Sequence, residues 1–364
     1  MTTRNVLILS GRFGKGHDTV AEAAAVALVP LDVETRTVDA ISLLGGPGSV
    51  LGERVFRTLL SRPALYDAFH FGQLRQGGRL ARRFDVAARR AMERPLRALT
   101  GDFPPALILS VFATGAAGGA WYAAQHPDTA TAVLITDSYA HRLWVHERTD
   151  LFLVTSALCA HAVRSFRPEA SVVVIPHPAR PEFYAAPARA EARTRLGLPA
   201  DADVAVLMSG AWGIGPLAEC AEALAADGLW VLAVAGTNDR LHRRLVAASR
   251  RERRLVPFGF TDQVPTLMAA SDVVISSSGD TCREARVVGR PLVLLDVVPG
   301  HGRENLMHEL ELGHAVVAQP SPRVLTRATR RVLADSARHR IRPVTSPADF
   351  ETQLRAALAA IGFE

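Results

Sequence analysis

Residues 6–23 read VLILSGRFGKGHDTVAEA, a short apolar run that leads into a glycine-rich segment and then into a helical pattern. The apolar run Val6–Ser10 is typical of a strand buried in a parallel sheet. Glycines after it allow the backbone to approach a ligand closely, and a helix beginning near Asp18 would present free N–H groups at the same place. This stretch therefore predicts the first strand, loop and helix of an α/β domain.

Apolar runs of strand length alternate with helical patterns along the rest of the chain. In the first half these runs are Val6–Ser10, Val33–Val38, Ala106–Val111, Thr131–Ile135, Leu151–Val154 and Val172–Ile175. In the second half they are Val204–Met208, Leu229–Ala235, Val273–Ser276, Pro291–Leu295 and Ala315–Val317. Short apolar strands with helical crossovers predict parallel sheets covered by helices on both faces.

A proline-rich stretch separates the two series of strands. The prolines are Pro176, Pro178, Pro181 and Pro187, with Pro199 just beyond. They predict that residues 175–195 resist regular structure and form an interdomain linker. We therefore expect two doubly wound α/β domains, residues 1–178 and 179–345, that face each other across a cleft. Residues 347–361 predict one more helix, so 346–364 forms a C-terminal helical segment.

The composition is that of a globular chain long enough for two domains: of its 364 residues, 48% are hydrophobic and 21% charged. The net charge is +6, carried almost entirely by arginine because Lys15 is the only lysine. An arginine-rich surface attracts phosphates, nucleic acid or anionic lipid headgroups. The arginines lie in both halves without interleaved aromatic residues, so we expect no nucleic-acid partner.

Cysteines and apolar segments bear on the compartment. Cys159, Cys220 and Cys282 match no zinc or redox spacing, which predicts reduced thiols in a cytoplasmic protein. No signal peptide is visible, and no stretch approaches the ~18 apolar residues that span a bilayer. If the protein binds a membrane, we expect it to bind peripherally, on the inner face of the cell membrane.

The glycine-rich opening leaves the role of His17 undecided. A dinucleotide-binding loop is one interpretation, because Asp39 lies about as far along the sequence as the acidic residue that binds ribose in such folds. The glycines, however, lack the G-x-G-x-x-G spacing of that loop. His17, directly after the glycines, has a side chain that can take a proton from an acceptor hydroxyl. It can equally cap the helix without chemistry.

Several segments resemble one family. In the first half they are GKGHDTVAEA at 14–23, TDSYAHRLWVH at 136–146 and ARPEF at 179–183. In the second half they are MSGAWGIG at 208–215, GFT at 259–261 with LMAASD at 267–272, SGDTCREA at 278–285 and PGHGREN at 299–305. Together, and in this order, they are similar to motifs of the monogalactosyldiacylglycerol synthases and the bacterial processive diacylglycerol glucosyltransferases, which belong to glycosyltransferase family 28.

The resemblance implies a fold and an activity. The fold would be GT-B-like, with an acceptor-binding N-terminal domain, a nucleotide-sugar-binding C-terminal domain and a C-terminal helix that returns towards the N-terminal domain. The reaction would be an inverting, metal-independent transfer of a hexose from a UDP-sugar to a lipid acceptor such as diacylglycerol. No cofactor is implied, because the UDP-sugar is a substrate.

The resemblance also implies site residues. His17 is the expected catalytic base and Asp137 its rival, although Asp137 can instead orient His17 or cap a helix. The acceptor residues are expected to be Gly14, Gly16, His141 and Trp144, the last two with a structural role as the alternative. The donor residues are expected to be Ser209, Gly210, Gly213, Phe260, Thr261, Ser278, Gly279, Asp280, Thr281, Glu284, His301, Glu304 and Asn305.

Each group of donor residues has an expected task. Backbone N–H groups and helix N-termini in the loops would hold the diphosphate. Glu284 would accept hydrogen bonds from the ribose hydroxyls, the alternative being an acid that only complements the helix dipole. The backbone of Phe260 would meet uracil, and Glu304 and Asn305 would face the sugar.

This chain departs from the family pattern in three places. Asp280 follows Gly279 in a loop that is one residue shorter, His301 and Gly302 stand where the family tends to have Gln-Glu, and Lys15 replaces a glycine. These departures bear on the donor sugar and on acceptor entry.

Other interpretations remain open at this point. Eight arginines lie among apolar residues between Arg75 and Arg97, which predicts either a helix lying on an anionic membrane surface or an ordinary solvated helix. A natural-product or cell-envelope acceptor would keep the same chemistry. A nucleotide-sugar 2-epimerase and an inactive nucleotide-sugar-binding module are the alternatives from other classes.

Overall fold

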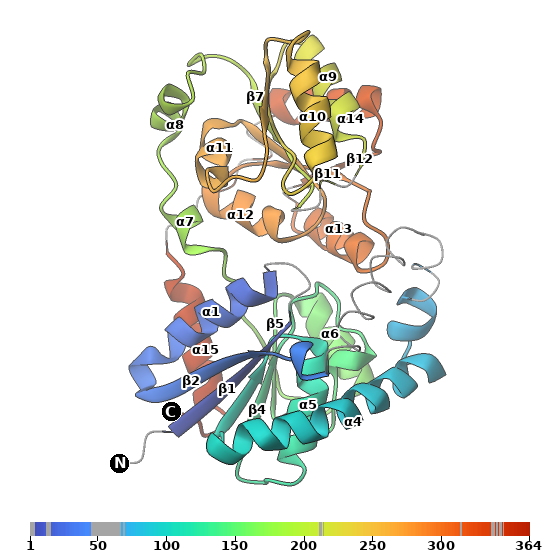
Figure 1. Ribbon diagram of the computed structural model, residues 1–364, viewed down its shortest axis with the longest axis vertical. Coiled ribbons are helices and arrows are strands. Elements are labelled where there is room, and N and C mark those ends of the chain that lie inside the picture. The colour runs from blue at the N-terminus through green and yellow to red at the C-terminus, as the bar shows by residue number, and fades with distance from the viewer. Residues whose placement is uncertain are drawn as a thin grey trace. The chain divides into compact units, whose positions relative to one another are not determined.

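The computed structural model describes residues 4–11, 16–44, 67, 70–210, 213, 215–313, 315–335, 339, 341, 344 and 346–364. The chain divides into two compact units (Figure 1). Unit 1 comprises Met1–Pro178 together with Ala348–Glu364, and unit 2 comprises Ala179–Pro347.

Unit 1 is built on a six-stranded parallel sheet with the strand order β2-β1-β3-β4-β5-β6. Its strands are β1 Arg4–Ser10, β2 Val33–Asp39, β3 Leu107–Ser110, β4 Ala130–Leu134, β5 Leu151–Val154 and β6 Val172–Val174. Its α-helices are α1 Gly16–Leu28, α4 Arg79–Asp102, α5 Ala113–Ala123, α6 Ala157–Phe166 and α15 Ala348–Ala359. Shorter helical turns are η1 Val29–Leu31, η2 Ser42–Leu44, η3 His70–Leu74 and η4 Arg142–Trp144.

Successive residues of a strand point to opposite faces of the sheet, so an apolar strand presents apolar side chains on both faces. Helices cover both faces of this sheet. On β1, Val6 and Ile8 are buried in the cluster that includes side chains of α1 and α15. Leu7 and Leu9 are buried in the cluster formed with α4 and α5. Completely buried strands of this kind explain the nearly continuous apolar runs seen in the sequence.

Unit 2 is also built on a six-stranded parallel sheet, with the order β12-β11-β10-β7-β8-β9. Its strands are β7 Val204–Leu207, β8 Trp230–Val234, β9 Leu255–Phe258, β10 Val273–Ser276, β11 Leu292–Leu295 and β12 Ala315–Ala318. Its helices are α7 Pro181–Tyr184, α8 Arg189–Arg195, α9 Leu217–Ala226, α10 Asp239–Ser249, α11 Val264–Ala270, α12 Asp280–Val288, α13 His301–Glu311 and α14 Pro322–Ala334.

The structure confirms the predicted fold class of two parallel α/β sheets, each with helices on both faces. It also confirms the predicted C-terminal helix. This helix, α15, follows unit 2 in the chain but packs within unit 1, where Phe350 and Leu354 are buried beside side chains of α1.

One expectation about secondary structure is wrong, and one strand was not predicted. Residues 175–195 were expected to lack regular structure, but α7 and α8 lie within them; Pro181 occupies the first turn of α7, where a missing N–H costs nothing. The strand β9 was not expected, because Pro257 interrupts its apolar run. Pro257 is tolerated because β9 is an edge strand.

Candidate active site

His17 lies in the first turn of α1, which follows β1 at the carboxyl edge of the unit 1 sheet. Its ring nitrogen Nδ1 lies 2.9 Å from the carbonyl oxygen of Val111 and 3.2 Å from Oγ1 of Thr136. A carbonyl oxygen only accepts hydrogen bonds, so Nδ1 carries the hydrogen and the lone pair of the neutral ring is on Nε2. This is the tautomer in which Nε2 can act as a base.

Asp137 follows β4 and contacts two of the residues expected to bind the acceptor. Its Oδ2 accepts a hydrogen bond of 2.7 Å from Nε1 of Trp144 and lies 3.4 Å from Nε2 of His141. The side chain of Trp144 is buried. The structure thus brings Asp137, His141 and Trp144 together. Gly16 begins α1, and Gly14 lies outside the described residues.

In unit 2, the loops expected to hold the donor follow β7 and β10, which are neighbours in the sheet. Ser209 comes just after β7, and its buried hydroxyl has no hydrogen-bond partner among the described residues. Gly210 is next. Gly213 has φ +57°, and a Cβ there would lie 2.8 Å from Leu241 Cδ2, so the turn requires glycine. Ligands of open α/β sheets bind at this carboxyl edge.

The loop after β10 leads into α12, with Gly279 at the N-cap and no side chain capping the helix. Among the described residues, and apart from its two chain neighbours, no residue has an atom within 4 Å of a Cβ built on Gly279, so the first turn is open to close approach. Asp280 begins α12 and forms an ion pair with Arg283. That ion pair offsets the negative charge that Asp280 adds at a helix end suited to phosphate. Thr281 is buried in the same turn.

Glu284 lies one turn further along α12 and is 6% exposed. Burial raises the pKa of Glu284 above its usual 4.5, whereas the neighbouring Arg180 opposes the shift. Nε of Arg180 donates a 2.9 Å hydrogen bond to Oε1 of Glu284. Arg180 thereby favours the charged carboxylate, the form that accepts hydrogen bonds from hydroxyl groups.

The first turns of α13 carry His301, Glu304 and Asn305. Oγ of Ser278 donates a hydrogen bond to the carbonyl oxygen of Gly302, which joins the β10–α12 loop to the start of α13. A Cβ on Gly302 would lie 2.4 Å from Val298 Cγ1. The departure at Gly302 is therefore a packing requirement of this chain.

Phe260 and Thr261 follow β9, where the nucleobase was expected. Phe260 is 64% exposed, and Oγ1 of Thr261 accepts a hydrogen bond of 3.1 Å from the backbone N–H of Gln263. The hydrogen bond fixes the turn that leads into α11.

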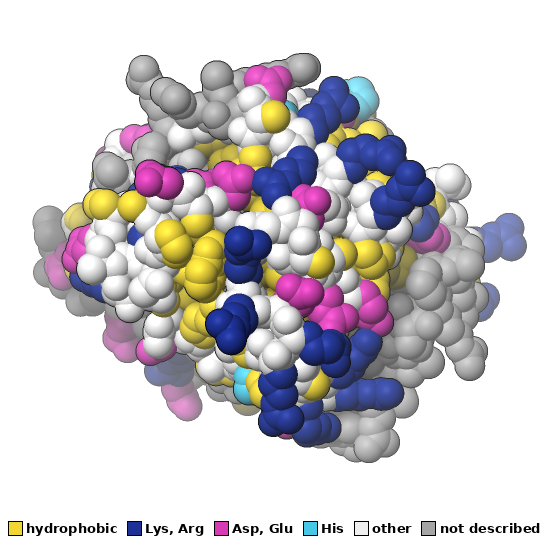
Figure 2. Space-filling model, turned by 90° about the horizontal axis from the view of Figure 1, so that it is seen from above, with side chains coloured by type: hydrophobic (Ala, Val, Ile, Leu, Met, Phe, Trp, Pro, Cys, Tyr) yellow, Lys and Arg dark blue, Asp and Glu magenta, His cyan; other side chains and the backbone are white. Residues whose placement is uncertain are grey.

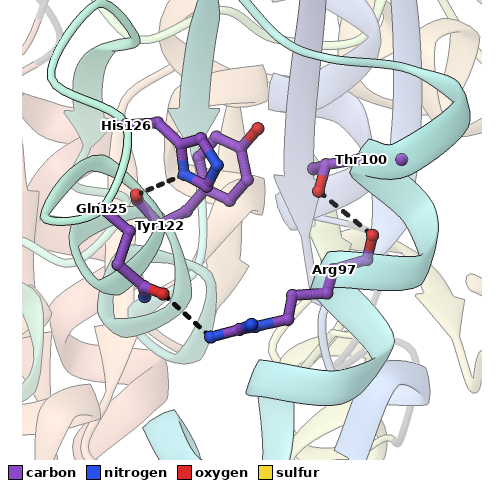
Figure 3. A pocket seen from close by; sticks show the side chains of 6 residues that line it. Arg97, Thr100, Tyr122, Gln125 and His126 are labelled. Atoms are coloured by element: carbon purple, nitrogen blue, oxygen red, sulfur yellow. Dashed lines mark hydrogen bonds between the residues drawn. The ribbon is translucent and has the colours of Figure 1, made fainter.

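Other features of the structure lie away from the expected donor and acceptor residues. In unit 1, a pocket of about 370 Å³ lies between the ends of α4 and α5 and is lined by Arg97, Thr100, Gly101, Tyr122, Gln125 and His126 (Figure 3). No expected site residue lines it. In the described part of the chain, no group of three or more His, Cys, Asp or Glu could hold a metal ion. The sequence motif Asp-x-Asp occurs at Asp201 and Asp203, at the amino end of β7. Asp203 forms an ion pair with Arg330.

Sequence reasoning missed the partners of the key side chains. Arg180 was noted only as part of a motif, and its contact with Glu284 spans 104 positions. Val111 and Thr136 were seen as strand ends and not as partners of His17. The available signal was topological, because β1, β3 and β4 lie in that order and their carboxyl ends meet.

Comparison with known proteins gives relatives of modest identity. No family model matches the chain. The processive diacylglycerol beta-glucosyltransferase of Bacillus subtilis is 24% identical over 348 residues, which are 94% of this chain and 90% of that protein. A probable monogalactosyldiacylglycerol synthase of Nicotiana tabacum is 29% identical over 196 residues, 50% of this chain and 36% of that protein. The chain resembles diacylglycerol glycosyltransferases over most of its length. These relatives confirm the family resemblance drawn from the motifs.

Solved structures agree on the fold. CalG4, the calicheamicin glycosyltransferase, matches with a TM-score of 0.62 at 18% identity, covering 99% of this chain and 100% of that one. UDP-GlcNAc 2-epimerase from Neisseria meningitidis, bound to UDP-GlcNAc, matches with a TM-score of 0.59 at 12% identity, covering 98% and 100%. The expected GT-B-like class is confirmed, and because an epimerase shares it, the fold does not choose between transfer and epimerisation.

Proposed function

We propose that this protein is a glycosyltransferase that moves a hexose from a UDP-sugar to a lipid alcohol such as diacylglycerol. The observation that carries the proposal is His17, whose Nδ1 is held by the carbonyl of Val111 so that Nε2 has the lone pair. The diacylglycerol glycosyltransferases of similar sequence support the lipid acceptor.

The proposed donor site is the carboxyl edge of the unit 2 sheet. The buried hydroxyl of Ser209 and the uncapped first turn of α12 suit the diphosphate, because both offer hydrogen-bond donors and the turn is open to close approach. The carboxylate of Glu284, kept charged by Arg180, suits the two ribose hydroxyls. Glu304 and Asn305 of α13 are the proposed partners of the sugar.

The proposed chemistry is a single inverting displacement. Nε2 of His17 takes the proton of the acceptor hydroxyl as its oxygen attacks the anomeric carbon. The bond from that carbon to the diphosphate oxygen breaks, and UDP leaves with the electron pair. Backbone N–H groups and the dipole of α12 stabilise the charge that develops on the leaving group.

The proposed meeting point with the lipid is the outer face of α4. Leu80 and Phe84, one helical turn apart, are 46% and 55% exposed, and Ala87 and Ala91 continue the same exposed stripe. The exposed side chains of Arg83, Arg90 and Arg94 lie beside it. Exposed apolar side chains flanked by arginines suit an anionic membrane surface.

Further observations bear on this membrane interpretation. Arg75 packs 4.1 Å from the centroid of the Tyr139 ring and is not part of the stripe. None of the helices that the structure describes is long and apolar enough to cross a bilayer.

On the face drawn in Figure 2, arginine side chains are interspersed with apolar and acidic ones, unlike a continuous basic groove. We propose that the protein lies on the cytoplasmic face of the membrane, which also fits its three buried cysteine thiols.

The proposal is tested with a donor screen and one variant pair. The enzyme is incubated with UDP-glucose, UDP-galactose or UDP-N-acetylglucosamine and with vesicles that contain diacylglycerol, and UDP and glycolipid are measured by mass spectrometry. We expect one UDP to be released for each hexose found in the glycolipid. Epimerised donor without any acceptor product would favour the 2-epimerase instead, and transfer only to a soluble acceptor would favour a natural-product enzyme.

The His17→Ala variant tests the base. We expect kcat to fall by about 10²- to 10⁴-fold, the usual contribution of a general base, while the Kd of UDP measured by calorimetry stays unchanged. His161→Ala, an exposed histidine on α6, is the matched control and should keep full activity. Full activity of His17→Ala would remove His17 from this role.

A further inference from the structure

Gly11, directly after β1, lies against the ring of Phe112. A Cβ built on Gly11 would lie 2.3 Å from Cγ of Phe112 and 2.6 Å from Cδ1 and Cδ2. The backbone of Gly11 is not in the left-handed region, so its φ would permit alanine. The three nearest atoms to that Cβ all belong to the Phe112 ring, so the ring leaves no room for a side chain at this point.

The same Phe112 ring packs against His17. The two ring centroids are 5.0 Å apart, and the rings meet edge to face with an interplanar angle of 80°. Val111, the residue before Phe112, accepts the hydrogen bond from Nδ1 of His17 through its carbonyl. The Val111 N–H donates to the carbonyl of Leu9 on β1, which fixes this dipeptide to the sheet.

We infer that Phe112 is a positioning residue for His17 and that Gly11 is required because it makes room for the Phe112 ring. The inference rests on the proposed function, in which His17 is the base. Neither residue is assigned contact with substrate.

The contacts of Nδ1 with Val111 and Thr136 fix the tautomer of His17 and the position of that ring atom. They do not by themselves set the rotation of the ring about that atom. An aromatic ring packed edge to face removes this freedom. General-base catalysis requires Nε2 within hydrogen-bond reach of the acceptor oxygen, and a shift of about 1 Å can cost about 10²-fold in rate.

A double-mutant cycle tests the inference. Gly11→Ala displaces the Phe112 ring, and Phe112→Leu removes it, so each change should lower kcat by about 10- to 100-fold. The KM for the UDP-sugar and the Kd of UDP should not change, because both changes lie in unit 1. Leucine keeps Cγ at the point of the clash, so the double variant is built on Phe112→Ala. If Gly11 acts only through Phe112, Gly11→Ala/Phe112→Ala should be no slower than Phe112→Ala alone.

Two controls separate positioning from general damage. Phe112→Tyr keeps a ring edge at the same place and should restore most of the turnover. Gly118→Ala introduces a methyl group elsewhere in unit 1, 2.5 Å from the flexible end of Met92 at Cε, and none of its three nearest atoms belongs to Phe112. It should keep a wild-type kcat, and thermal unfolding of all variants shows whether any loss comes from instability.

The outcomes are distinguishable from failure of the proposed function. If His17→Ala keeps full turnover, the assignment of the base is wrong. If His17→Ala is inactive but Gly11→Ala and Phe112→Leu keep wild-type kcat, only the positioning inference is wrong. Multiplicative losses in the double variant, or no rescue by Phe112→Tyr, would also overturn it.

Discussion

At the residue scale, Glu284 shows how a buried carboxylate can remain usable. It is 6% exposed, and burial raises its pKa. Its hydrogen-bonded neighbour Arg180 acts in the opposite direction. A raised pKa means that the charged form is lost as the pH falls through a value above 4.5. Donor affinity should follow that charge.

In the Arg180→Met variant, the loss of UDP affinity at low pH should therefore begin at a higher pH than in the wild type. The variant loses the cation that opposes protonation of Glu284, so the carboxylate takes up its proton earlier as the pH falls. We expect UDP binding to weaken by about tenfold or more near pH 6, since a hydrogen bond to a charged group contributes about 1.5–3 kcal/mol. Calorimetric titration from pH 5 to 8 measures it.

UDP itself also ionises in this pH range, and this affects its Kd for both proteins in the same way. Comparing the variant with the wild type at each pH therefore cancels that effect. Arg195→Met is a matched control, because Arg195 pairs with Glu191 on the exposed face of α8. Parallel pH profiles for Arg180→Met and wild type would show that Arg180 does not set the charge of Glu284.

These residue contacts mark the limit of what sequence could predict. The motifs placed Glu284 on the helix after the second loop, and the structure has it on α12. Its partner Arg180 lies beyond four strands of intervening chain, so no local spacing links the two. The same holds for Gly11 and Phe112, whose contact depends on the packing of β1 beside β3.

At the element scale, two glycines near the starts of α12 and α13 have opposite requirements. Gly302 has no room for a side chain because of Val298, whereas Gly279 faces open space. If the phosphates of the donor occupy that space, the two positions should respond differently to the same added methyl group.

Gly302→Ala should lose stability, and Gly279→Ala should lose affinity. Overpacking at Gly302 should lower the free energy of unfolding by about 1–3 kcal/mol. Gly279→Ala should unfold like wild type but bind UDP more weakly, because its methyl group would occupy the place of a phosphate. Thermal unfolding and calorimetry of both variants measure this. Unchanged UDP affinity in Gly279→Ala would place the diphosphate elsewhere.

The stripe on α4 is the other prediction at this scale. Replacing both Leu80 and Phe84 by serine should weaken binding to anionic vesicles by tenfold or more, since burial of one such side chain contributes about 1.5–3 kcal/mol. Val26 and Val29 are also exposed, at 60% and 70%, but lie on α1 and η1. Their double serine variant is the control and should bind as wild type. Equal binding to neutral and anionic vesicles would argue against the role of the arginines.

Elements were easier to predict from the sequence than contacts, for a physical reason. Strands buried on both faces need continuous apolar runs, so the inner strands β1, β3, β4, β5, β7, β8, β10 and β11 could be recognised locally. The edge strand β9 is only partly buried and tolerates Pro257, which removed the signal. The short helices α7 and α8 were hidden by the prolines around them.

At the scale of the whole molecule, unit 1 is discontinuous in sequence. The chain leaves it at Pro178 and returns at Ala348, and α15 then completes its core. Phe350, Leu354 and Leu358 of α15 are buried beside Ala24 and Leu28 of α1. A chain that lacks α15 would leave this apolar face of unit 1 uncovered.

Leu354→Ala should therefore destabilise unit 1 and leave unit 2 intact. Leu354 is completely buried, and truncating such a side chain costs about 2–5 kcal/mol. Hydrogen exchange read by mass spectrometry should show faster exchange in β1 and α1, with β7 and β10 unchanged. Leu325→Ala, equally buried on α14, is the matched control and should reverse the pattern. Loss of protection in both units from either change would show that they unfold as one cooperative body.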